Sequence, residues 1–355
     1  MAAATLSVVV RGVGLVGPGL VSWAAAQAVL QGRAALVRAA TVVPPPQRLP
    51  AAERRRAGVA VKIAVAVADA ACADAGADPQ TLGSVFASSS GDGANCHTLC
   101  ETLASPNPAD RLVSPTRFTN SVHNAPAGYW HIAVGSRAAS TSLCAFDASF
   151  GAGLIAALTQ VHAAHVPLLL VASDTPYPEP LHTLRRLPDA LGVALVLAPV
   201  PTGETPDDEQ GTTLRVTLCP ADQAPPETPC REAALEALRQ QVPAARALPL
   251  LEALARGVAA TVVIAATPPL VLVPEVVPAC PRPRRRCWTG PASARWCRTP
   301  AAWCCWMRCR PGTPQRSAAP PPATPRPTTR CAARVVCSRP PRSNTPPRPP
   351  RCMAG

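Results

Sequence analysis

The sequence predicts a layered α/β domain, a sheet with helices on both faces, followed by a disordered C-terminal tail. Short apolar runs alternate with Ala-rich helical stretches over residues 1–275, which is typical of a layered α/β arrangement. Runs such as Leu168–Val171 show no polar alternation, as expected for strands that are buried on both sides. Residues 276–355 lose both patterns.

The expected elements follow one another along residues 1–275. Short strand-like runs lie at Leu6–Val10, Val85–Phe86, Ser142–Phe146, Leu168–Ala172, Val193–Leu197, Leu214–Leu218 and Ala260–Ala265. Helical stretches, most of them rich in Ala and Leu, lie at Glu53–Gly76, Gly151–His165, Glu232–Gln241 and Leu250–Arg256. Gly76 and Gly257 stand where a left-handed C-cap would end a helix.

The excess of positive charge is confined to the tail. Of the 34 basic and 21 acidic side chains, 16 basic and no acidic ones lie after Glu275, so residues 1–275 carry a formal charge of −3 and the tail +16. The tail also holds nine of the 15 cysteines. Because its many prolines block helix interiors and central strands, we expect residues 276–355 to be disordered.

Three interpretations of the tail remain open. Clustered arginines suit a nucleic acid or an anionic membrane surface, and cysteines suit a zinc module, although the tail has no C-x-x-C pair. The third is translation of GC-rich DNA in a wrong reading frame, which the aperiodic Pro, Arg, Ala, Cys and Trp composition favours. We assign the tail no function, place the domain boundary at residue 275 and expect no nucleic-acid partner.

No stretch of the sequence approaches the roughly 20 apolar residues that span a membrane. Arg11, Pro18 and several glycines interrupt the N-terminal apolar segment, so we expect no membrane span and a cytoplasmic chain. In that compartment the cysteines of residues 1–275 are expected to be reduced, mostly buried thiols. They are Cys72, Cys96, Cys100, Cys144, Cys219 and Cys230.

Three short motifs are interpreted as structural. Gly12–Gly17 matches G-x-G-x-x-G, but no acidic residue precedes Glu53, whereas a dinucleotide site needs one about 20 residues after the motif. Ser88–Gly93 lacks the lysine of a phosphate-binding loop and suits a tight turn after a strand. Cys96–Cys100 contains two thiols and an imidazole but has no second ligand pair nearby. We therefore expect neither a cofactor nor a metal ion.

The stretch Ser140–Leu154 carries the most information about function. A strand, a sharp turn of small residues and an Ala-rich helix follow one another there, which is the arrangement of a nucleophile elbow. The helix dipole at such a turn favours an anionic thiolate. His123 and His131 flank a nearby loop and are candidate acid–base groups.

Residues 5–275 resemble the β-ketoacyl synthase family, which has the thiolase fold. Val9–Gly19 is similar to the opening strand and glycine turn of that family. Arg54–Arg56 leads into the long Ala-rich helix, and Gly83–Gly93 then follows in the family's order. The order and spacing of these segments carry the resemblance.

The family's active-site stretch reads Asp-Thr-Ala-Cys, and the residues from Asp147 to Phe150 occupy that place here, with Ser149 before Phe150 and Gly153 in register. The nucleophile position is therefore Phe150. Phenylalanine has no nucleophilic group, so the resemblance implies that the acyl thioester needed for condensation cannot form. The two family histidines, found in His-Gly-Thr and Gly-His contexts, have no counterpart in residues 160–355.

Within the family, the chain is most similar to short chain-length factors of aryl-polyene and related polyketide systems, about half of a full ketosynthase. The resemblance implies a catalytically silent subunit of a fatty-acid- or aryl-polyene-type polyketide elongation system. Its implied partners are an active ketosynthase subunit and an acyl carrier protein, in a hetero- or homodimer. Phe150 would fill or shape an acyl tunnel, and the face left bare by the missing half would be apolar and exposed.

Two other functions remain open. An active acyltransferase would use Cys144 as nucleophile, with His123 or His131 as base. Cys144 lies inside an expected strand, six residues before Phe150, where packing is favoured over reaction. A nucleic-acid or membrane binder would act through the basic tail.

Overall fold

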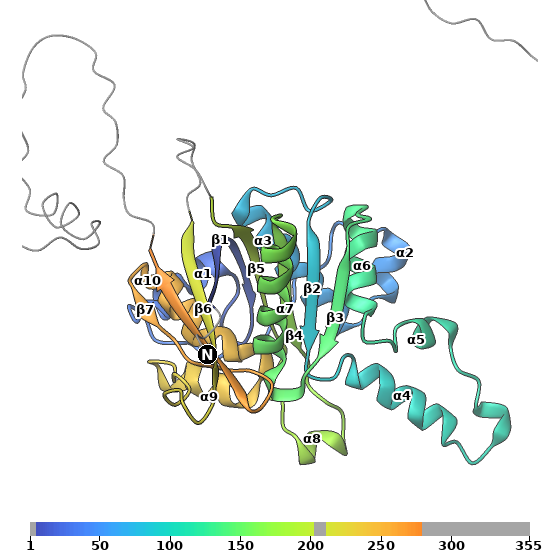
Figure 1. The fold of residues 1–355 in the computed structure, drawn as a ribbon. Coiled ribbons are helices and arrows are strands. Elements are labelled where there is room, and N and C mark those ends of the chain that lie inside the picture. The colour runs from blue at the N-terminus through green and yellow to red at the C-terminus, as the bar shows by residue number, and fades with distance from the viewer. Residues whose placement is uncertain (1–4, 202–210, 279–355) are drawn as a thin grey trace, which may run out of the picture. The chain divides into compact units, whose positions relative to one another are not determined.

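The computed structural model describes residues 5–201 and 211–278. Its centre is one mixed sheet of nine strands in the order β3-β2-β4-β5-β1-β6-β9-β7, with β8 paired to β9 (Figure 1). The strands are β1 (Thr5–Val16), β2 (Gly83–Ser88), β3 (Ser140–Cys144), β4 (Leu168–Asp174), β5 (Leu191–Pro199), β6 (Thr212–Pro220), β7 (Ala260–Thr261), β8 (Ile264–Ala265) and β9 (Leu270–Val277). Strand β2 pairs in parallel with β3 and β4, and the other pairs are antiparallel.

The helices lie between the strands along the chain. The α-helices are α1 (Trp23–Leu30), α2 (Ala51–Arg56), α3 (Val59–Ala75), α4 (Gly93–Leu103), α5 (Pro115–Thr119), α6 (Ala125–Val134), α7 (Ser149–Ala164), α8 (Leu181–Leu184), α9 (Ala233–Gln241) and α10 (Leu248–Arg256). Short 3₁₀ helices are η1 (Pro108–Asp110), η2 (Phe146–Ala148) and η3 (Pro243–Ala247). All four predicted helical stretches are present, with bounds that differ at their ends and with one stretch divided.

Helices cover both faces of the sheet, as predicted. On one face α3 packs against β1, β4 and β5, and α6 packs on α3, whereas α7 packs on the other face along β2 and β4 (Figure 1). Successive residues of β4 enter different cores: Leu168 and Leu170 join the cluster around α7, and Leu169 and Val171 join the cluster around α3. A strand between two helix layers buries both of its sides, which explains why no polar residue alternates along it.

The glycines of the first strand have a packing role. The predicted strand Leu6–Val10 continues as β1 through the glycines, so the expected glycine turn does not begin at Gly12. A Cβ on Gly14 would lie 2.0 Å from the carbonyl oxygen of Val67 in α3, and Gly12 is similarly crowded by the same helix. Both glycines therefore allow α3 to lie directly on β1, whereas the third glycine of the motif, Gly17, faces Leu191 of β5.

The predicted helix Glu53–Gly76 is divided in two. The chain is extended at Ala57, and Gly58 precedes the first turn of α3. A Cβ on Gly58 would lie 2.8 Å from Oδ2 of Asp92, so the chain passes close to the start of α4 at this point. Helix α2 buries none of its residues and α3 buries nine, because only α3 lies on the sheet. Gly76 ends α3 in the left-handed conformation, as predicted.

The ends of two predicted strands also differ. The run Ala260–Ala265 forms β7 and β8, two residues each, and both pair with β9. The run Ser142–Phe146 ends earlier, at Cys144, because Phe146 adopts a positive φ of 53°. The sequence predicts disorder for residues 276–355, and this is wrong for Val276 and Val277, which belong to β9. The residues after 278 lie outside the described ranges. None of the helices in the described ranges combines the length and the apolar character that a membrane span requires.

The expectation of mostly buried cysteines is wrong. All six cysteines of residues 1–275 are unpaired, but Cys72 and Cys230 are buried, Cys96 and Cys219 are partly buried, and Cys100 and Cys144 are exposed. Cys100 lies on α4, which buries only Asn95, and Cys144 ends the outermost strand of the sheet. Burial disfavours the thiolate form, and desolvation raises the pKa of the buried Cys72 thiol to about 12.

Candidate functional site

The predicted elbow is present between β3 and α7. Strand β3 ends at Cys144, η2 makes the turn, and Ser149 begins the helix. The Ser149 hydroxyl fixes this turn: its Oγ accepts a hydrogen bond from the Ala145 N–H at 3.0 Å and lies 2.7 Å from the carbonyl oxygens of Ser88 and Phe146, to one of which it donates. The elbow is therefore tied to the end of the neighbouring strand β2.

Phe150, the second residue of α7, is completely buried in the apolar cluster on this face of the sheet. The adjacent backbone is closely covered, because a Cβ on Gly151 would lie only 2.1 Å from the carbonyl oxygen of Ala265 in β8. A Cβ on Gly153 would lie 2.9 Å from the Cβ of Ala87 in β2. The start of α7 is thus enclosed by β8 on one side and by the sheet on the other.

A second set of contacts covers the elbow from the connection between β4 and β5. Arg185 forms an ion pair with Asp147, and its guanidinium lies 3.5 Å from the ring centroid of Phe146. The same guanidinium donates a hydrogen bond to the Tyr177 hydroxyl at 3.0 Å. A cation over an aromatic face adds to the ion pair, so Arg185 holds the 175–190 connection against the turn.

Sequence reasoning missed a buried carboxylate at this end of the sheet. Asp174, the last residue of β4, is 4% exposed and accepts hydrogen bonds from the backbone N–H groups of Ser89 at 2.7 Å and Ala244 at 2.8 Å. Burial raises the pKa of the Asp174 carboxyl, although these hydrogen bonds act in the opposite direction. Asp174 therefore joins the loop after β2 to η3, and the signal in the sequence is an acid directly after an apolar strand.

Cys144 does not occupy the buried place that the sequence suggested. It is exposed at the end of β3, and its Sγ lies 3.5 Å from the Ser88 hydroxyl. Cys144 is exposed because β3 is the outermost strand of the sheet and, among the described strands, pairs only with β2.

His131, one of the two candidate histidines, lies away from Cys144. His131 Nε2 is 3.5 Å from Ser84 Oγ, and Ser84 pairs with Ser140 at the start of β3. Cys144 lies at the other end of β3, where it pairs with Ser88. Four residues of strand separate these positions by about 13 Å. His131 therefore lies near the wrong end of β3 to serve Cys144 as a base.

His123 lies on the loop before α6 and is exposed. It lines, with His131, Ser140 and Ser142, an open groove of about 500 Å³ beside β3. The structure thus brings the two histidines to one groove. Among the described residues, no hydrogen bond joins either imidazole to Cys144, and no group of three His, Cys, Asp or Glu side chains is placed to hold a metal ion.

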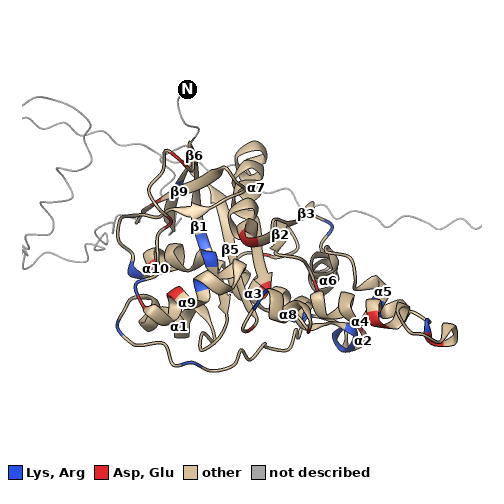
Figure 2. Ribbon diagram, turned by 90° about the horizontal axis from the view of Figure 1, so that it is seen from below, with Lys and Arg blue, Asp and Glu red and all other residues tan. Residues whose placement is uncertain are grey.

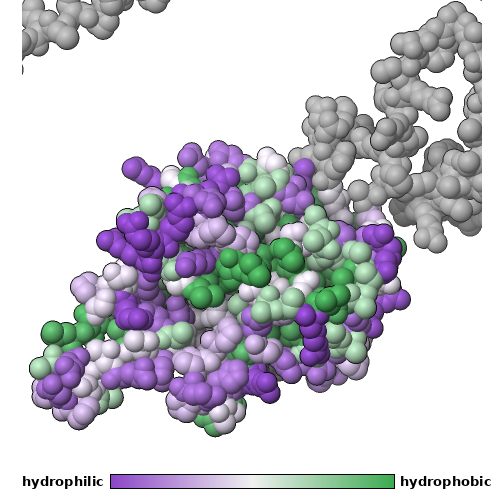
Figure 3. Space-filling view, turned by 180° about the vertical axis from the view of Figure 1, so that it is seen from behind, coloured by the Kyte–Doolittle hydropathy of each residue, from purple (hydrophilic) through white to green (hydrophobic). Residues whose placement is uncertain are grey.

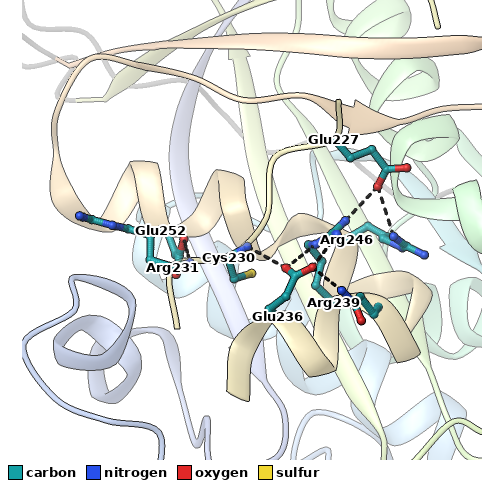
Figure 4. Close-up of polar contacts among 8 residues, drawn as sticks. Glu227, Cys230, Arg231, Glu236, Arg239, Arg246 and Glu252 are labelled. Atoms are coloured by element: carbon teal, nitrogen blue, oxygen red, sulfur yellow. Dashed lines mark hydrogen bonds and ion pairs between the residues drawn. The ribbon is translucent and has the colours of Figure 1, made fainter. Parts of the chain in front are cut away.

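A cluster of charged side chains in and around α9 holds η3, the short helix that packs against α7 (Figure 4). Arg239, 10% exposed at its side chain, bonds Glu236 at 2.7 Å and Glu227 at 2.9 Å, and Arg246 lies 3.2 Å from Glu227. Hydrogen bonds from Arg239 hold the pKa of Glu236 at about 2. Burial raises the pKa of Glu252, which accepts from the backbone beside this cluster. These pairs connect α9 to η3, the element that packs against α7.

Comparison with known proteins identifies the family of the chain and proteins that share its fold. The sequence profile described as β-ketoacyl synthase, N-terminal domain, matches residues 22–249. A ketosynthase in complex with its chain length factor, from Xenorhabdus doucetiae, is 20% identical with a TM-score of 0.57, covering 76% of this chain and 99% of that chain. No curated protein matches the sequence.

Two further solved structures match over similar lengths. The ishigamide ketosynthase/chain length factor is 16% identical with a TM-score of 0.58, covering 77% of this chain and 99% of that chain. A type II polyketide synthase acyl-carrier protein in complex with its ketosynthase bound to the hexaketide is 12% identical with a TM-score of 0.58, covering 78% and 100%. At these identities the structures show a common thiolase-like fold.

Proposed function

The chain belongs to the β-ketoacyl synthase family, and from this premise we propose that it is a catalytically silent, chain-length-factor-like subunit of a polyketide or fatty-acid elongation system. The aryl-polyene type is part of this proposal and rests on the sequence resemblance. Two of the similar structures are described as pairs of a ketosynthase and a chain length factor, and a third as a ketosynthase with its acyl-carrier protein. They support an active ketosynthase and an acyl carrier protein as partners.

One observation carries the proposal of silence. The position at the start of α7 holds Phe150, which is fully buried, and the Ala265 carbonyl lies against the next residue. Covalent catalysis of acyl transfer needs a nucleophile that an acyl thioester can reach. Phe150 offers no nucleophilic atom, and the enclosed backbone leaves no space beside Gly151 for the reacting carbonyl. Filling or shaping an acyl tunnel remains a proposed role for Phe150.

The outer edge of β3 supports association with another subunit. Ser140–Cys144 contains neither a lysine nor a proline, the residues that commonly protect a sheet edge from pairing. Beside it, α4 and α5 form an arm that extends from the sheet (Figure 1). Large apolar side chains are exposed on and around this arm, namely Leu103, Leu112, Phe118 and Val122. Figure 3 shows apolar surface on the arm among polar atoms. A ketosynthase that paired with β3 would also cover this arm.

The test uses purified protein with and without an active ketosynthase subunit. Alone, the chain should give no condensation of acyl and malonyl thioesters, whereas co-expression should give a complex detected by light scattering after gel filtration. Ser142→Lys adds a charge on the β3 edge and should reduce complex formation. Gln240→Lys adds the same charge on the exposed side of α9 and should not. Condensation by the chain alone would overturn the proposal of silence.

Because Cys144 is exposed, a second function, acyl transfer by this thiol, is also tested. An acyltransferase using this thiol would be labelled stoichiometrically by an acyl-thioester mimic, and the label would be lost in Cys144→Ala. The distance between the two ends of β3 argues against His131 as the base. We expect no stoichiometric labelling, and a label that also required His123 would favour the acyltransferase.

We further propose that residues 1–275 form the functional domain and that residues 276–355 come from a shifted reading frame. Strand β9 ends at Val277, two residues past this boundary and before Arg282, the first arginine after Glu275. A chain ending after residue 278 should keep its helical and strand content by circular dichroism and should still bind a ketosynthase. Salt-sensitive DNA binding that disappears with the tail would instead favour a nucleic-acid role for it.

A further inference from the structure

A polar groove of about 520 Å³ lies between α2, α4 and α5, apart from the elbow. It is lined by Ala52, Arg55, Arg56, Asn95, Ser114, Thr116, Arg117 and Asn120. Figure 2 shows basic positions on α2 beside α4 and α5. Because residues 1–275 carry a net charge of −3, three arginines in one groove form a local positive site on a slightly acidic domain.

Two buried asparagines fix the walls of this groove. Asn120, 7% exposed, donates from Nδ2 to the carbonyl oxygen of Arg56 at 2.9 Å, and its Oδ1 accepts from the Tyr129 hydroxyl at 3.0 Å. Asn95, 8% exposed, donates from Nδ2 to the carbonyl oxygen of Arg117 at 2.8 Å. Buried amides satisfied in this way hold the backbone of both arginine-bearing segments in place.

The arginines themselves differ in their partners. Arg56 forms an ion pair with Glu53 at 2.8 Å. The side chains of Arg55 and Arg117 are exposed, and neither has an ion pair or a side-chain hydrogen bond with any described residue. Two guanidinium groups on opposite walls are therefore available to an anion. The hydroxyls of Ser114 and Thr116 add donors to the same lining.

We propose that this groove binds the phosphoryl group of a small phosphate ester. Guanidinium groups bond phosphate oxygens in pairs, with charge-assisted hydrogen bonds that neutral donors do not match. Phosphate is favoured over a broad acidic protein surface, because the arginines converge on one groove and are not spread over a face of the domain. The groove shares no lining residue with the elbow. Because α4 and α5 also form the arm that is proposed to contact a ketosynthase, the site is tested on the chain without that partner.

The experiment titrates the full chain with inorganic pyrophosphate by isothermal calorimetry at low ionic strength. Arg55→Gln/Arg117→Gln removes the two available cations, and Arg38→Gln/Arg137→Gln removes two exposed arginines outside the groove. Both variants keep the tail and the same net charge. We expect about tenfold or greater weakening in the first variant and none in the second.

Equal weakening in the two variants, or none in either, would overturn the proposal, because binding would then reflect charge in general or the tail. A third arm replaces pyrophosphate with a poly-glutamate peptide of equal charge. Weaker binding of the peptide supports a phosphoryl site, whereas equal or tighter binding that also depends on Arg55 and Arg117 would assign the groove to an acidic protein instead. Melting temperatures of the variants confirm that each is folded.

Discussion

Replacing Phe150 by alanine tests whether the residue proposed to occupy the nucleophile position is a packed part of the core. The side chain is 0% exposed, and truncating a buried phenylalanine costs about 3–5 kcal/mol of unfolding free energy. The cost is lower where neighbours relax into the cavity. Here Gly151 and Gly153 already bring β8 and β2 against the helix, so little further approach is available. We therefore expect about 4–5 kcal/mol for Phe150→Ala.

Urea unfolding followed by far-UV circular dichroism measures this loss. With an m value on the order of 3 kcal/mol/M, the midpoint should fall by about 1.5 M. Phe146→Ala is the matched control, because Phe146 is 58% exposed and contacts Arg185 rather than the core, so that about 1 kcal/mol or less is expected. A loss at Phe150 below about 1.5 kcal/mol, or equal to that at Phe146, would refute the packed position.

Three further predictions concern stability measured in the same way. Gly151→Ala should cost about 1–3 kcal/mol, because its Cβ would meet a backbone carbonyl at 2.1 Å, whereas Gly128→Ala, in open space on α6, should stabilise by about 0.5–1 kcal/mol. Burial raises the pKa of the Asp174 carboxyl in the folded state, so the native state binds the proton of this carboxyl more tightly than the unfolded state does. The stability of the native chain relative to Asp174→Asn should therefore fall as pH rises above about 4, and a difference independent of pH would contradict the buried carboxyl. Arg239→Met should cost about 2–4 kcal/mol at pH 7. Since the pKa of Glu236 is lowered to about 2, the stabilisation from that pair is present above about pH 4 and is lost as pH falls towards 2, which a pH series of both chains would show.

The errors of sequence reasoning share a physical cause. The resemblance of Val9–Gly19 to an opening strand and glycine turn gives no sign that Gly12 and Gly14 let α3 approach β1, a contact with residues more than 50 positions away. Asp174 was not singled out, because its two donors, on Ser89 and Ala244, lie 85 and 70 residues from it. Periodicity reports whether a residue is buried in a helix or strand, and it carries no information about which distant segment lies opposite.

The sequence by itself determined the class of fold, the order of most helices and strands and the separation of charge between residues 1–275 and the tail, and its resemblance to the family led to the proposal that Phe150 stands at the nucleophile position. Each of these depends on residue type or on local apolar spacing. The tertiary structure alone decided that β8 encloses the start of α7, that Cys144 and His131 lie towards opposite ends of β3, and that Arg55 and Arg117 line one groove. These features depend on the order and register of strands in the sheet, which long-range packing sets and no local pattern encodes.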